Sequence, residues 1–397
     1  MDKKSILVFG VGELQKSIIK RAKGMGLYVV GIDPCANAFC RDEVDAFEIV
    51  GGQDYEETMS VAKKYNISAV VTAATDKPLV MMARVAEALN LKFYSVETAQ
   101  ISTDKFLMKQ CFERDGIPCA KGRLVHSLED ATSLTYPVIA KPRDNSGSRG
   151  VVLCRNKEEL KTAIDDALSF SKKDTILVEE FIEGSEYSIE SLHFDGRDEV
   201  IQFTEKTTTP FPYNVELEHK QPANLTDVQK IEIRALIRKI GKSLNFENCG
   251  SHTELKINNR GIFIIETSPR LGGGNITSHL VPISTGINIE DQVLNISVGN
   301  SVNLSNNISP KCVGIRFLNF PQGIITKIDT RINDVAKWPN VVEFNFKLNK
   351  GDLVKPFKSG LDRYGELIVF ASEYNELIEI MNKYSLKIST YIDIKSI

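Results

Sequence analysis

Two acids, an arginine and a glycine loop lie close together around a segment that predicts a β-hairpin. In HTELKINNRGIFIIET, two stretches rich in apolar residues flank the turn NNRG at 258–261. This turn suits a three-residue hairpin loop with its glycine in the left-handed conformation. If Asn258 then faces Ile262, Glu254 falls directly opposite Glu266, with β-carbons about 4.5–5.5 Å apart.

Two carboxylates held this close repel each other unless something offsets their charge. A shared proton, a nearby base or a divalent cation could do so. Mg²⁺ is the best candidate, because it prefers hard oxygen ligands and commonly combines one or two carboxylates with substrate phosphates and water. The alternative is an exposed hairpin with two solvated acids.

The residues after the second acid favour the metal interpretation. Arg270 follows Glu266 by four residues, across Pro269, and is expected near the predicted cation. The three glycines at 272–274 can present backbone amides without side-chain obstruction, as an anion-binding loop does. An acid pair, an arginine and such a loop together predict a centre for phosphoryl transfer.

A second loop could hold the phosphates of a nucleotide. Lys141 ends the apolar stretch VIAKP, and the loop at 143–150, RDNSGSRG, follows it. The loop can fold over phosphates while the lysine supplies positive charge. It is not a P-loop, because no G-x-x-x-x-G-K-[ST] motif occurs in the chain. Taken alone, the loop could equally be a surface turn.

Composition places limits on these interpretations. A chain of 397 residues predicts two to four domains. The net charge of -3 argues against a large basic surface, so we expect small-molecule partners and neither nucleic acid nor membrane. The seven cysteines are scattered without a C-x-x-C pair, and the polar residues after MDKKSILVFGVG exclude a signal peptide, so a cytoplasmic location is expected. A homodimer stays open.

Residues 1–100 alternate short apolar strands with amphipathic helices, which predicts a parallel α/β sheet covered on both faces. Gly10 and Gly12 follow the first strand, and Asp33 ends the second, as in a dinucleotide-binding fingerprint. Gln15 stands where the third glycine should be, which breaks the fingerprint. A nicotinamide-dependent oxidoreductase is therefore a weaker alternative than a tight structural turn.

The rest of the chain predicts two further regions. A helix capped by Ser102 or Thr103 and ended at Gly116 marks a boundary near residue 100. Asn156 begins another helix, and a long helical pattern covers 225–244 before the hairpin. Beyond residue 305 short strands and turns precede a last helix near 374–384.

The ordered set of motifs resembles the ATP-grasp superfamily of carboxylate–amine ligases. The resemblance rests on STDKFLMK, on VIAKP with SGSRG, on VEEFIEGSEYSIE, on TELK and on IIETSPR, and it covers about residues 1–300. It implies a mixed α/β and α+β fold with a Rossmann-like domain preceding the ATP-grasp fold at 1–100. The two-subdomain ATP-grasp domain then spans 101–305, with a lid subdomain at about 115–185, and a small C-terminal α+β domain spans 306–397.

The resemblance also assigns roles to residues of this sequence. It implies that Lys105 and Lys141 contact ATP phosphates, with Lys141 also near the adenine and counted among the catalytic groups. The other nucleotide-binding residues that it implies are Ser146, Gly147, Ser148 and Gly150 in the lid, Glu179, Glu180, Phe181 and Ile182 at the adenine, and Glu186 at the ribose.

At the reaction centre, the resemblance implies metal binding by Glu254, Glu266 and Ser268, with Arg270 steadying an acyl phosphate. Ser268 departs from the family, in which many members have asparagine there, and this puts a second metal ion in doubt. The expected substrate-contacting residues are Arg270, Gly272, Gly273, Gly274 and Asn275.

The implied activity is an ATP- and Mg²⁺- or Mn²⁺-dependent ligase. It would activate a carboxylate as an acyl phosphate and join it to an amine, with release of ADP and phosphate. The tail from RLGGGNITSHL onward looks like the end of amino-acid ligases. Alternatives are a purine-pathway ligase of the phosphoribosylglycinamide synthetase type, a carbamoyl-phosphate-synthase-like enzyme and a non-catalytic ATP sensor.

Overall fold

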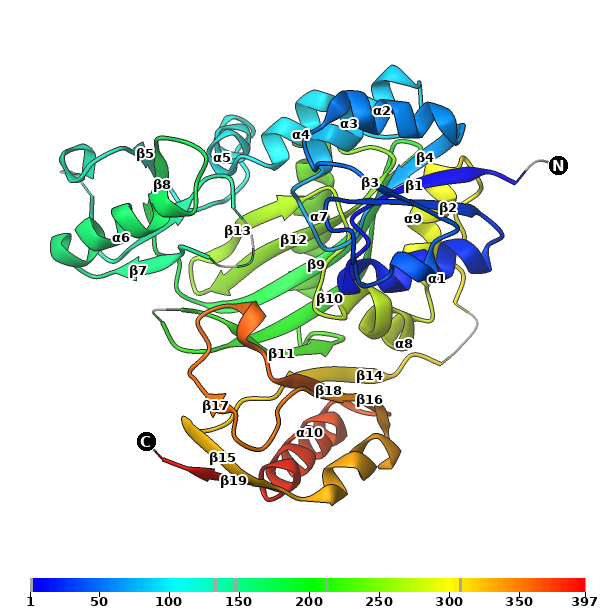
Figure 1. Ribbon diagram of the computed structural model, residues 1–397. Helices are drawn as coiled ribbons and strands as arrows, with labels where there is room; N and C mark the ends of the chain where they lie inside the picture. Colours follow the sequence, from blue (N-terminus) through cyan, green and yellow to red (C-terminus); the bar gives the residue numbers. More distant parts are fainter. Residues whose placement is uncertain are drawn as a thin grey trace.

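The amino-terminal residues form a four-stranded parallel sheet in the order β3-β2-β1-β4 (Figure 1). The computed structural model describes residues 3–131, 134–145, 147, 149–211, 213–306 and 309–396. The elements of this first unit are β1 (Ser5–Phe9), α1 (Lys16–Gly24), β2 (Tyr28–Asp33), β3 (Ala46–Ile49), α2 (Tyr55–Lys64), β4 (Ile67–Val71) and α3 (Leu79–Ala88).

Alternate residues of β1 point to opposite faces of this sheet. Ile6 and Val8 pack into a core with α1 and with α9 (Ile289–Ser297), whereas Leu7 and Phe9 pack into a second core with α2 and α3. The predicted parallel sheet with both faces covered is therefore confirmed.

The glycine turn after β1 is closed by a side chain of the protein itself. Gly10 has a φ of +85°, and the buried Gln15 spans the turn, accepting from the Gly12 N–H at 3.1 Å and donating to the Ala73 carbonyl at 2.6 Å. The residue that breaks the dinucleotide fingerprint thus takes the hydrogen bonds of the turn. This arrangement supports the structural interpretation over the nicotinamide alternative.

Two short helices connect the first unit to the rest, namely α4 (Val96–Ser102) and α5 (Lys105–Arg114). The predicted cap at Ser102 or Thr103 is wrong, because Ser102 ends α4 and the carboxylate of Asp104 accepts from the N–H groups of Phe106 and Leu107. An acid is a good N-cap because it satisfies amides that have no partner within the helix.

A second sheet has the order β5-β8-β6-β7, and one helix packs on it. Its elements are β5 (Gly122–Val125), β6 (Val138–Pro142), β7 (Val152–Cys154), α6 (Lys157–Ser169) and β8 (Ile176–Glu180). Asn156 caps α6, as predicted, by accepting from the Glu159 N–H at 2.8 Å. This layer lies beside the end of the central sheet formed by β12 and β13 (Figure 1).

The central sheet has eight antiparallel strands in the order β13-β12-β9-β10-β11-β14-β18-β16. Its strands are β9 (Ser185–Phe194), β10 (Arg197–Thr208), β11 (Glu216–Gln221), β12 (Cys249–Asn258), β13 (Gly261–Ser268), β14 (Cys312–Phe317), β16 (Val341–Phe346) and β18 (Gly365–Ala371). The helix α7 (Asp227–Leu244) packs on one face of this sheet, and α8 (Val281–Thr285) and α9 lie on the other.

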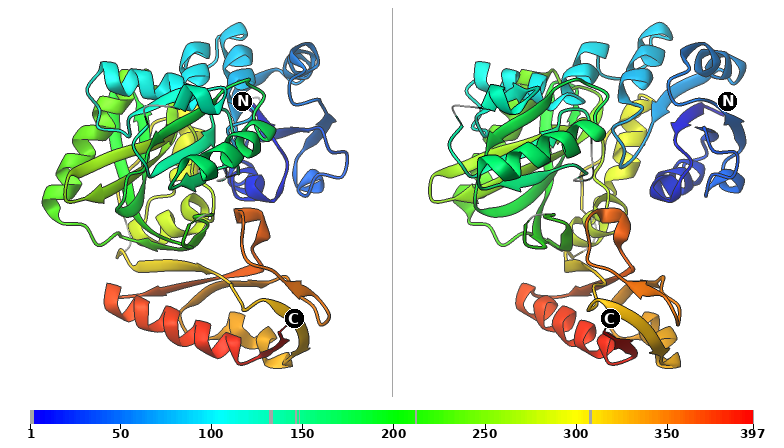
Figure 2. Two further views of the ribbon diagram at one scale, coloured as in Figure 1. Left: turned by 90° about the vertical axis from the view of Figure 1, so that its left-hand side faces the viewer. Right: turned by 60° about the vertical axis from the view of Figure 1, so that its left-hand side comes forward.

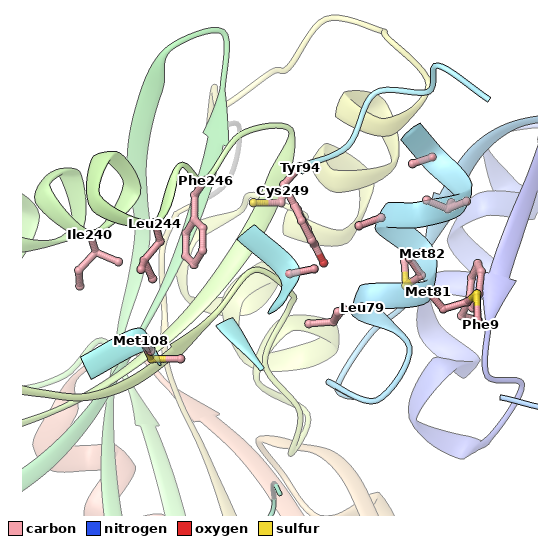
Figure 3. Close-up of a cluster of buried hydrophobic side chains, with 14 of the residues drawn as sticks. Phe9, Leu79, Met81, Met82, Tyr94, Met108, Ile240, Leu244, Phe246 and Cys249 are labelled. Carbon is pink, nitrogen blue, oxygen red and sulfur yellow. The ribbon is translucent and has the colours of Figure 1, made fainter. Parts of the chain in front are cut away.

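The largest apolar cluster joins the first unit to the central sheet (Figure 3). Leu79 and Met82 of α3 share this cluster with Ile240 and Leu244 of α7. Tyr187 and Ile189 of β9 face the same cluster, so their neighbours Glu186, Ser188 and Glu190 point to the opposite face. The alternation therefore leaves a polar stripe on the face away from α7.

The carboxy-terminal residues extend the central sheet, because β14 pairs with β11 and β18 pairs with β14. A small sheet of β17 (Leu353–Val354), β15 (Gly323–Ile328) and β19 (Ile392–Lys395) and the helix α10 (Tyr374–Ser389) complete this region. The helix runs five residues beyond the predicted end at 384. The predicted mixed α/β and α+β fold is confirmed.

Short turns of 3₁₀ or π helix link several elements: Glu13–Gln15, Arg41–Glu43, Leu128–Ala131, Ile276–Leu280, Thr330–Lys337 and Gly360–Asp362. Within the described ranges, every helix is too short or too polar to cross a lipid bilayer.

Candidate active site

Glu254 and Glu266 face each other across the β12–β13 hairpin, as predicted. The predicted three-residue loop is wrong, since Asn258 pairs with Gly261 and leaves a turn of two residues. A bulge between the turn and the acids restores the pair, because Leu255 faces Ile264 while Glu254 faces Glu266. The bulge adds to one strand the residue that the shorter turn removes.

Each acid of this pair contacts its own lysine. Lys105 Nζ lies 2.7 Å from Glu266 Oε2, and Lys206 Nζ of β10 lies 2.6 Å from Glu254 Oε1. These cations offset the repulsion that the facing carboxylates would otherwise suffer. Lysines thus neutralise the pair in the arrangement that the structure describes.

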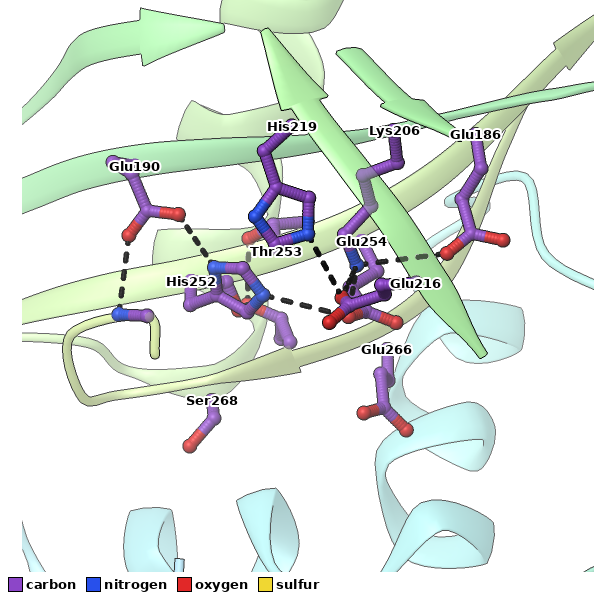
Figure 4. Close-up of polar contacts among 12 residues, drawn as sticks. Glu186, Glu190, Lys206, Glu216, His219, His252, Thr253, Glu254, Glu266 and Ser268 are labelled. Carbon is purple, nitrogen blue, oxygen red and sulfur yellow. Dashed lines mark hydrogen bonds and ion pairs between the residues drawn. The ribbon is translucent and has the colours of Figure 1, made fainter. Parts of the chain in front are cut away.

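Lys206 is the centre of a buried ionic cluster (Figure 4). Its Nζ also lies 2.9 Å from Glu216 Oε1 and 3.5 Å from Glu186 Oε1. Burial opposes the charge of Lys206, but the carboxylates of Glu216 and Glu254 outweigh it and hold the lysine pKa well above its usual value. Burial likewise opposes the charge of Glu216, yet Lys206 keeps the pKa of that carboxyl well below its usual value.

His252 connects the buried acid Glu190 to Glu254 of this cluster. His252 Nδ1 lies 2.5 Å from Glu190 Oε1, and His252 Nε2 lies 3.4 Å from Glu254 Oε1. Burial disfavours the charged imidazole, but the Glu190 carboxylate outweighs burial and raises the pKa of His252 to about 9. Protonated His252 therefore balances the charge of Glu190 and aligns Glu254.

Arg270 is held by an acid of the first unit. Its Nε and Nη2 donate to the two carboxylate oxygens of Asp76 at 2.9 and 3.1 Å, and Ser268 Oγ donates to Asp76 Oδ1 at 2.6 Å. Burial raises the pKa of Asp76, but the neighbouring Arg270 outweighs it and lowers the pKa to about 2. Asp76 thus connects the loop after β4 to two predicted site residues.

The glycine loop packs tightly against this cluster. A side chain at Gly272 would place its Cβ 2.6 Å from His252 Nδ1, and one at Gly274 would meet His219 Cε1 at 3.0 Å. The Gly272 N–H donates to Glu190 Oε2 at 3.2 Å, so the prediction of bare amides does not hold for this residue. Asn275 has a φ of +60° at the start of the following π turn. Close packing therefore explains the need for glycine here.

A buried triad joins β6, β8 and α5. The Glu179 carboxylate pairs with Lys141 on one oxygen and with Lys109 Nζ, 2.9 Å away, on the other. Burial lowers the pKa of Lys141, and the neighbouring Lys109 adds to this shift. The Glu179 carboxylate opposes the shift but does not cancel it. Because the Glu179 side chain is engaged here, its contact with a nucleotide would come from the backbone.

A cleft between the second sheet and the central sheet brings most of the predicted residues together. Lysines and glutamates line it together with apolar residues, as is typical of small-molecule sites. The predicted residues that line it are Lys105, Lys141, Gly147, Glu179, Glu180, Phe181, Ile182, Glu186, Glu254 and Glu266.

Other predicted residues lie elsewhere. Gly150 packs against Pro142 and Phe170 and does not line the cleft. Ser268, Arg270 and the glycine loop lie beyond the carboxylates, toward the first unit. Ser146 and Ser148 fall outside the described residues.

Aromatic residues form one end of the cleft. Phe181 and Phe211 meet edge to face with ring centres 5.3 Å apart, and Lys256 Nζ lies within 5.7 Å of both ring centres. An apolar surface with a few polar groups suits the planar base of a nucleotide. Lys256 was not predicted.

No three His, Cys, Asp or Glu side chains of the described residues gather as a metal site would require if it used these ligands alone. The facing pair of Glu254 and Glu266 nonetheless fits Mg²⁺, which commonly takes one or two carboxylates and completes its shell with phosphates and water.

Sequence reasoning missed Asp76 and Glu190 as members of the site. Asp76 and Glu190 lie 194 and 62 residues from their partners Arg270 and His252. Their local motifs carried no signal for these contacts. The alternation of β9 could have placed Glu186 and Glu190 on one face, although it could not say that β12 lies beside them.

Family models match two parts of the chain. One describes the ATP-grasp domain and matches residues 134–279, and the other describes the L-amino acid ligase C-terminal domain 2 and matches residues 316–392. An alanine–anticapsin ligase of Bacillus amyloliquefaciens is 27% identical over an alignment of 268 residues, which covers 61% of this chain and 56% of that protein. The chain therefore spans about half the length of this relative.

A second relative, an L-arginine-specific L-amino acid ligase of Bacillus subtilis, is 23% identical over 78% of this chain and 77% of that protein. Among solved structures, an L-amino acid ligase from Bacillus licheniformis superimposes with a TM-score of 0.84, covering all of both chains at 21% identity. A biotin carboxylase domain from Hydrogenobacter thermophilus, solved with MgADP and bicarbonate, gives 0.74 at 19% identity over 99% of this chain and 90% of that one. These likenesses establish the shared fold.

Proposed function

Since the chain carries an ATP-grasp domain followed by an L-amino acid ligase C-terminal domain, we propose that it is an ATP- and Mg²⁺-dependent ligase that joins an amino-acid carboxylate to an amine. The proposed reaction activates the carboxylate as an acyl phosphate, and the amine then displaces phosphate to form a C–N bond. ADP and phosphate are the other products. The single observation that carries the proposal is the facing pair Glu254 and Glu266, with a lysine on each acid, in the cleft between the second sheet and the central sheet.

The nucleotide would lie in the cleft between the second sheet and the central sheet. Lys105 and Lys141 supply positive charge for the phosphates, and Phe181 and Ile182 supply the apolar surface for adenine. Glu186 would bind the ribose hydroxyls. The loop at 146–150 would act as the lid, within a lid subdomain at about 115–185.

The residues present fit a divalent cation. Glu254 and Glu266 would hold Mg²⁺, or Mn²⁺, together with phosphate oxygens. Ser268 would assist, because a hydroxyl that donates to Asp76 still has oxygen lone pairs. When bound, the cation neutralises charge on the phosphates during transfer.

The groups beyond the carboxylates fit the transfer itself. Arg270 would stabilise the charge of the acyl phosphate, since its guanidinium is oriented by Asp76 before any substrate arrives. The glycine loop at 272–274 and Asn275 would border the substrate. Positioning and charge stabilisation account for most of such a reaction, because phosphoryl transfer needs little covalent chemistry from the protein.

The domain division that we propose keeps residues 1–100, 101–305 and 306–397 as the units of function, even though β14 and β18 continue the central sheet. A cytoplasmic location is supported by the seven free cysteines of the described residues and by the dependence on ATP.

The test is to incubate the full-length protein with ATP, MgCl₂ and a pool of L-amino acids. We expect phosphate release that depends on the pool, together with a product whose mass equals two amino acids less water. ATP binding without turnover on any carboxylate would overturn the ligase proposal and favour the sensor. A product from phosphoribosylamine and glycine would instead favour the purine-pathway alternative.

A further inference from the structure

A loop of the carboxy-terminal region, residues 355–364, reaches the polar face of the central sheet. The loop is closed by its own side chains: the Lys355 N–H donates to the Tyr364 hydroxyl at 2.6 Å, and the N–H groups of Lys358 and Ser359 donate to Asp362 Oδ2 at 2.9 and 2.8 Å. The loop projects from the carboxy-terminal region toward the central sheet (Figure 2). Its last part carries Arg363 toward Glu216.

Arg363 makes two contacts of different kinds. Its guanidinium carbon lies 3.4 Å from the ring centre of Phe317 on β14, and its Nη2 donates to Glu216 Oε2 at 2.7 Å. The planar stack and the ion pair fix the orientation of the guanidinium together. Arg363 is therefore a rigid support for the Glu216 carboxylate.

Glu216 connects this support to the candidate active site. Its other oxygen, Oε1, lies 2.9 Å from Lys206 Nζ and 3.4 Å from His219 Nε2. Lys206 in turn contacts Glu254. A chain of three ion pairs thus connects Arg363 of the carboxy-terminal region to Glu254 of the proposed metal pair.

His219 adds an observation that points to a ligand. The imidazole is 1% exposed, and its Nε2 faces Glu216, whereas its Nδ1 has no hydrogen-bond partner among the described residues. It stacks edge to face on Phe317, and its Cε1 borders Gly274 of the loop proposed to meet substrate. A buried ring nitrogen without such a partner, here Nδ1, is costly unless a bound group completes it.

We propose that Arg363 is a positioning residue through which the carboxy-terminal region sets the affinity for the carboxylate substrate. This inference rests on the proposed function. Arg363 holds one oxygen of Glu216 and offsets its charge, which leaves Lys206 able to balance Glu254. Without Arg363, the cluster loses one positive charge beside Glu216, and the excess negative charge around Lys206 repels an incoming carboxylate.

The experiment compares Arg363→Met with wild type on the full-length protein. Methionine keeps much of the apolar packing on Phe317 and removes the charge. We expect the KM for the amino-acid carboxylate to rise about tenfold or more, with the KM for ATP within about twofold. Arg363→Lys should recover part of the loss, because lysine restores the charge without the planar stack.

Two controls separate positioning from folding. Trp338 packs against Tyr384 and Tyr391 inside the carboxy-terminal region, so its fluorescence reports whether that region stays folded. Arg331→Met removes an arginine of the same region that pairs with Asp329 at an exposed position, and it should leave both KM values unchanged.

A double substitution tests the route of the effect. In a Glu216→Gln background, Arg363→Met should add less than about twofold to the KM, because Arg363 acts through Glu216. Unchanged KM values in Arg363→Met, or a full additional effect in the Glu216→Gln background, would overturn the inference.

Ligand binding distinguishes failure of this inference from failure of the proposed function. The probe is a mixture of the common L-α-amino acids, and the readout is the shift that it produces in Tm. If wild type shows no turnover but a shift that Arg363→Met loses, the ligase proposal fails and the inference stands. If neither turnover nor a shift is seen in wild type, both fail.

Discussion

Asp76 and Arg270 form a two-point ion pair that joins the first unit to the candidate active site. Both carboxylate oxygens of Asp76 accept from the guanidinium, at 2.9 and 3.1 Å, and the pair lies mostly out of solvent. Two parallel hydrogen bonds between a guanidinium and a carboxylate fix the orientation of the guanidinium as well as its distance. The orientation of Arg270 is therefore determined by a residue 194 positions earlier in the chain.

Asp76→Asn tests this relationship. The amide keeps the size of the side chain but can accept on one oxygen only, so Arg270 loses one contact and its full counter-charge. We expect kcat to fall by roughly tenfold to a hundredfold, as a small displacement of a catalytic group can cause, with little change in the KM for ATP. Steady-state kinetics with varied ATP measures both values.

The matched control for Asp76 is Asp54→Asn. Asp54 belongs to the same unit and caps α2, a task that asparagine performs equally well. An equal loss of kcat in both variants would show that the effect comes from general disturbance of the first unit.

Glu266→Gln should abolish turnover and leave the fold nearly intact. The Lys105–Glu266 pair is partly exposed, so its loss should lower the free energy of unfolding by about 1 kcal/mol or less. The loss of charge, in contrast, should remove most of the attraction for the divalent cation. Phosphate release and urea unfolding measure the two effects; a variant that lost its cooperative unfolding transition would show a structural role instead.

Glu179→Gln, in contrast, should clearly lower the stability of the fold, because this acid is buried between two lysines. Its removal leaves Lys109 and Lys141 without their shared counter-charge, and breaking such a pair costs about 3–5 kcal/mol. We expect a clear drop in the urea midpoint. Its neighbour Glu180 pairs with the exposed Arg260, so Glu180→Gln should cost under about 1 kcal/mol. Equal losses would contradict the role assigned to burial.

The hairpin shows what the sequence could predict and why. A turn flanked by two apolar stretches determined the facing pair of Glu254 and Glu266, because strand geometry is local and periodic. The loop length was wrong, and the pair was correct only because the bulge after Glu254 compensates for the shorter turn. Residue identity alone does not show where a bulge will form.

The residues that the sequence could not predict share a physical feature. Asp76 contacts Arg270 across 194 positions of the chain, and Arg363 contacts Glu216 across 147 positions. Their charges look like ordinary surface acids or bases in a linear sequence. Only the packing of the first unit and of the carboxy-terminal loop against the central sheet brings them to the site.

The pair of His252 and Glu190 predicts how stability depends on pH. The folded pKa of His252 is raised from its ordinary 6.5 to about 9. Its contribution is therefore fully present below pH 6.5 and is lost as pH rises through about 9, and it amounts to roughly 3 kcal/mol. Urea unfolding without nucleotide should show the difference between wild type and His252→Gln shrinking over that window.

His126→Gln is the control for this titration. His126 is exposed, directly follows β5 of the second sheet, and its Nδ1 contacts the Asp174 carbonyl. We expect the difference between wild type and His126→Gln to stay constant between pH 6 and pH 10, because this substitution leaves the pair of His252 and Glu190 intact. A constant difference between wild type and His252→Gln across that window would mean that His252 contributes by packing, not as a cation held by Glu190.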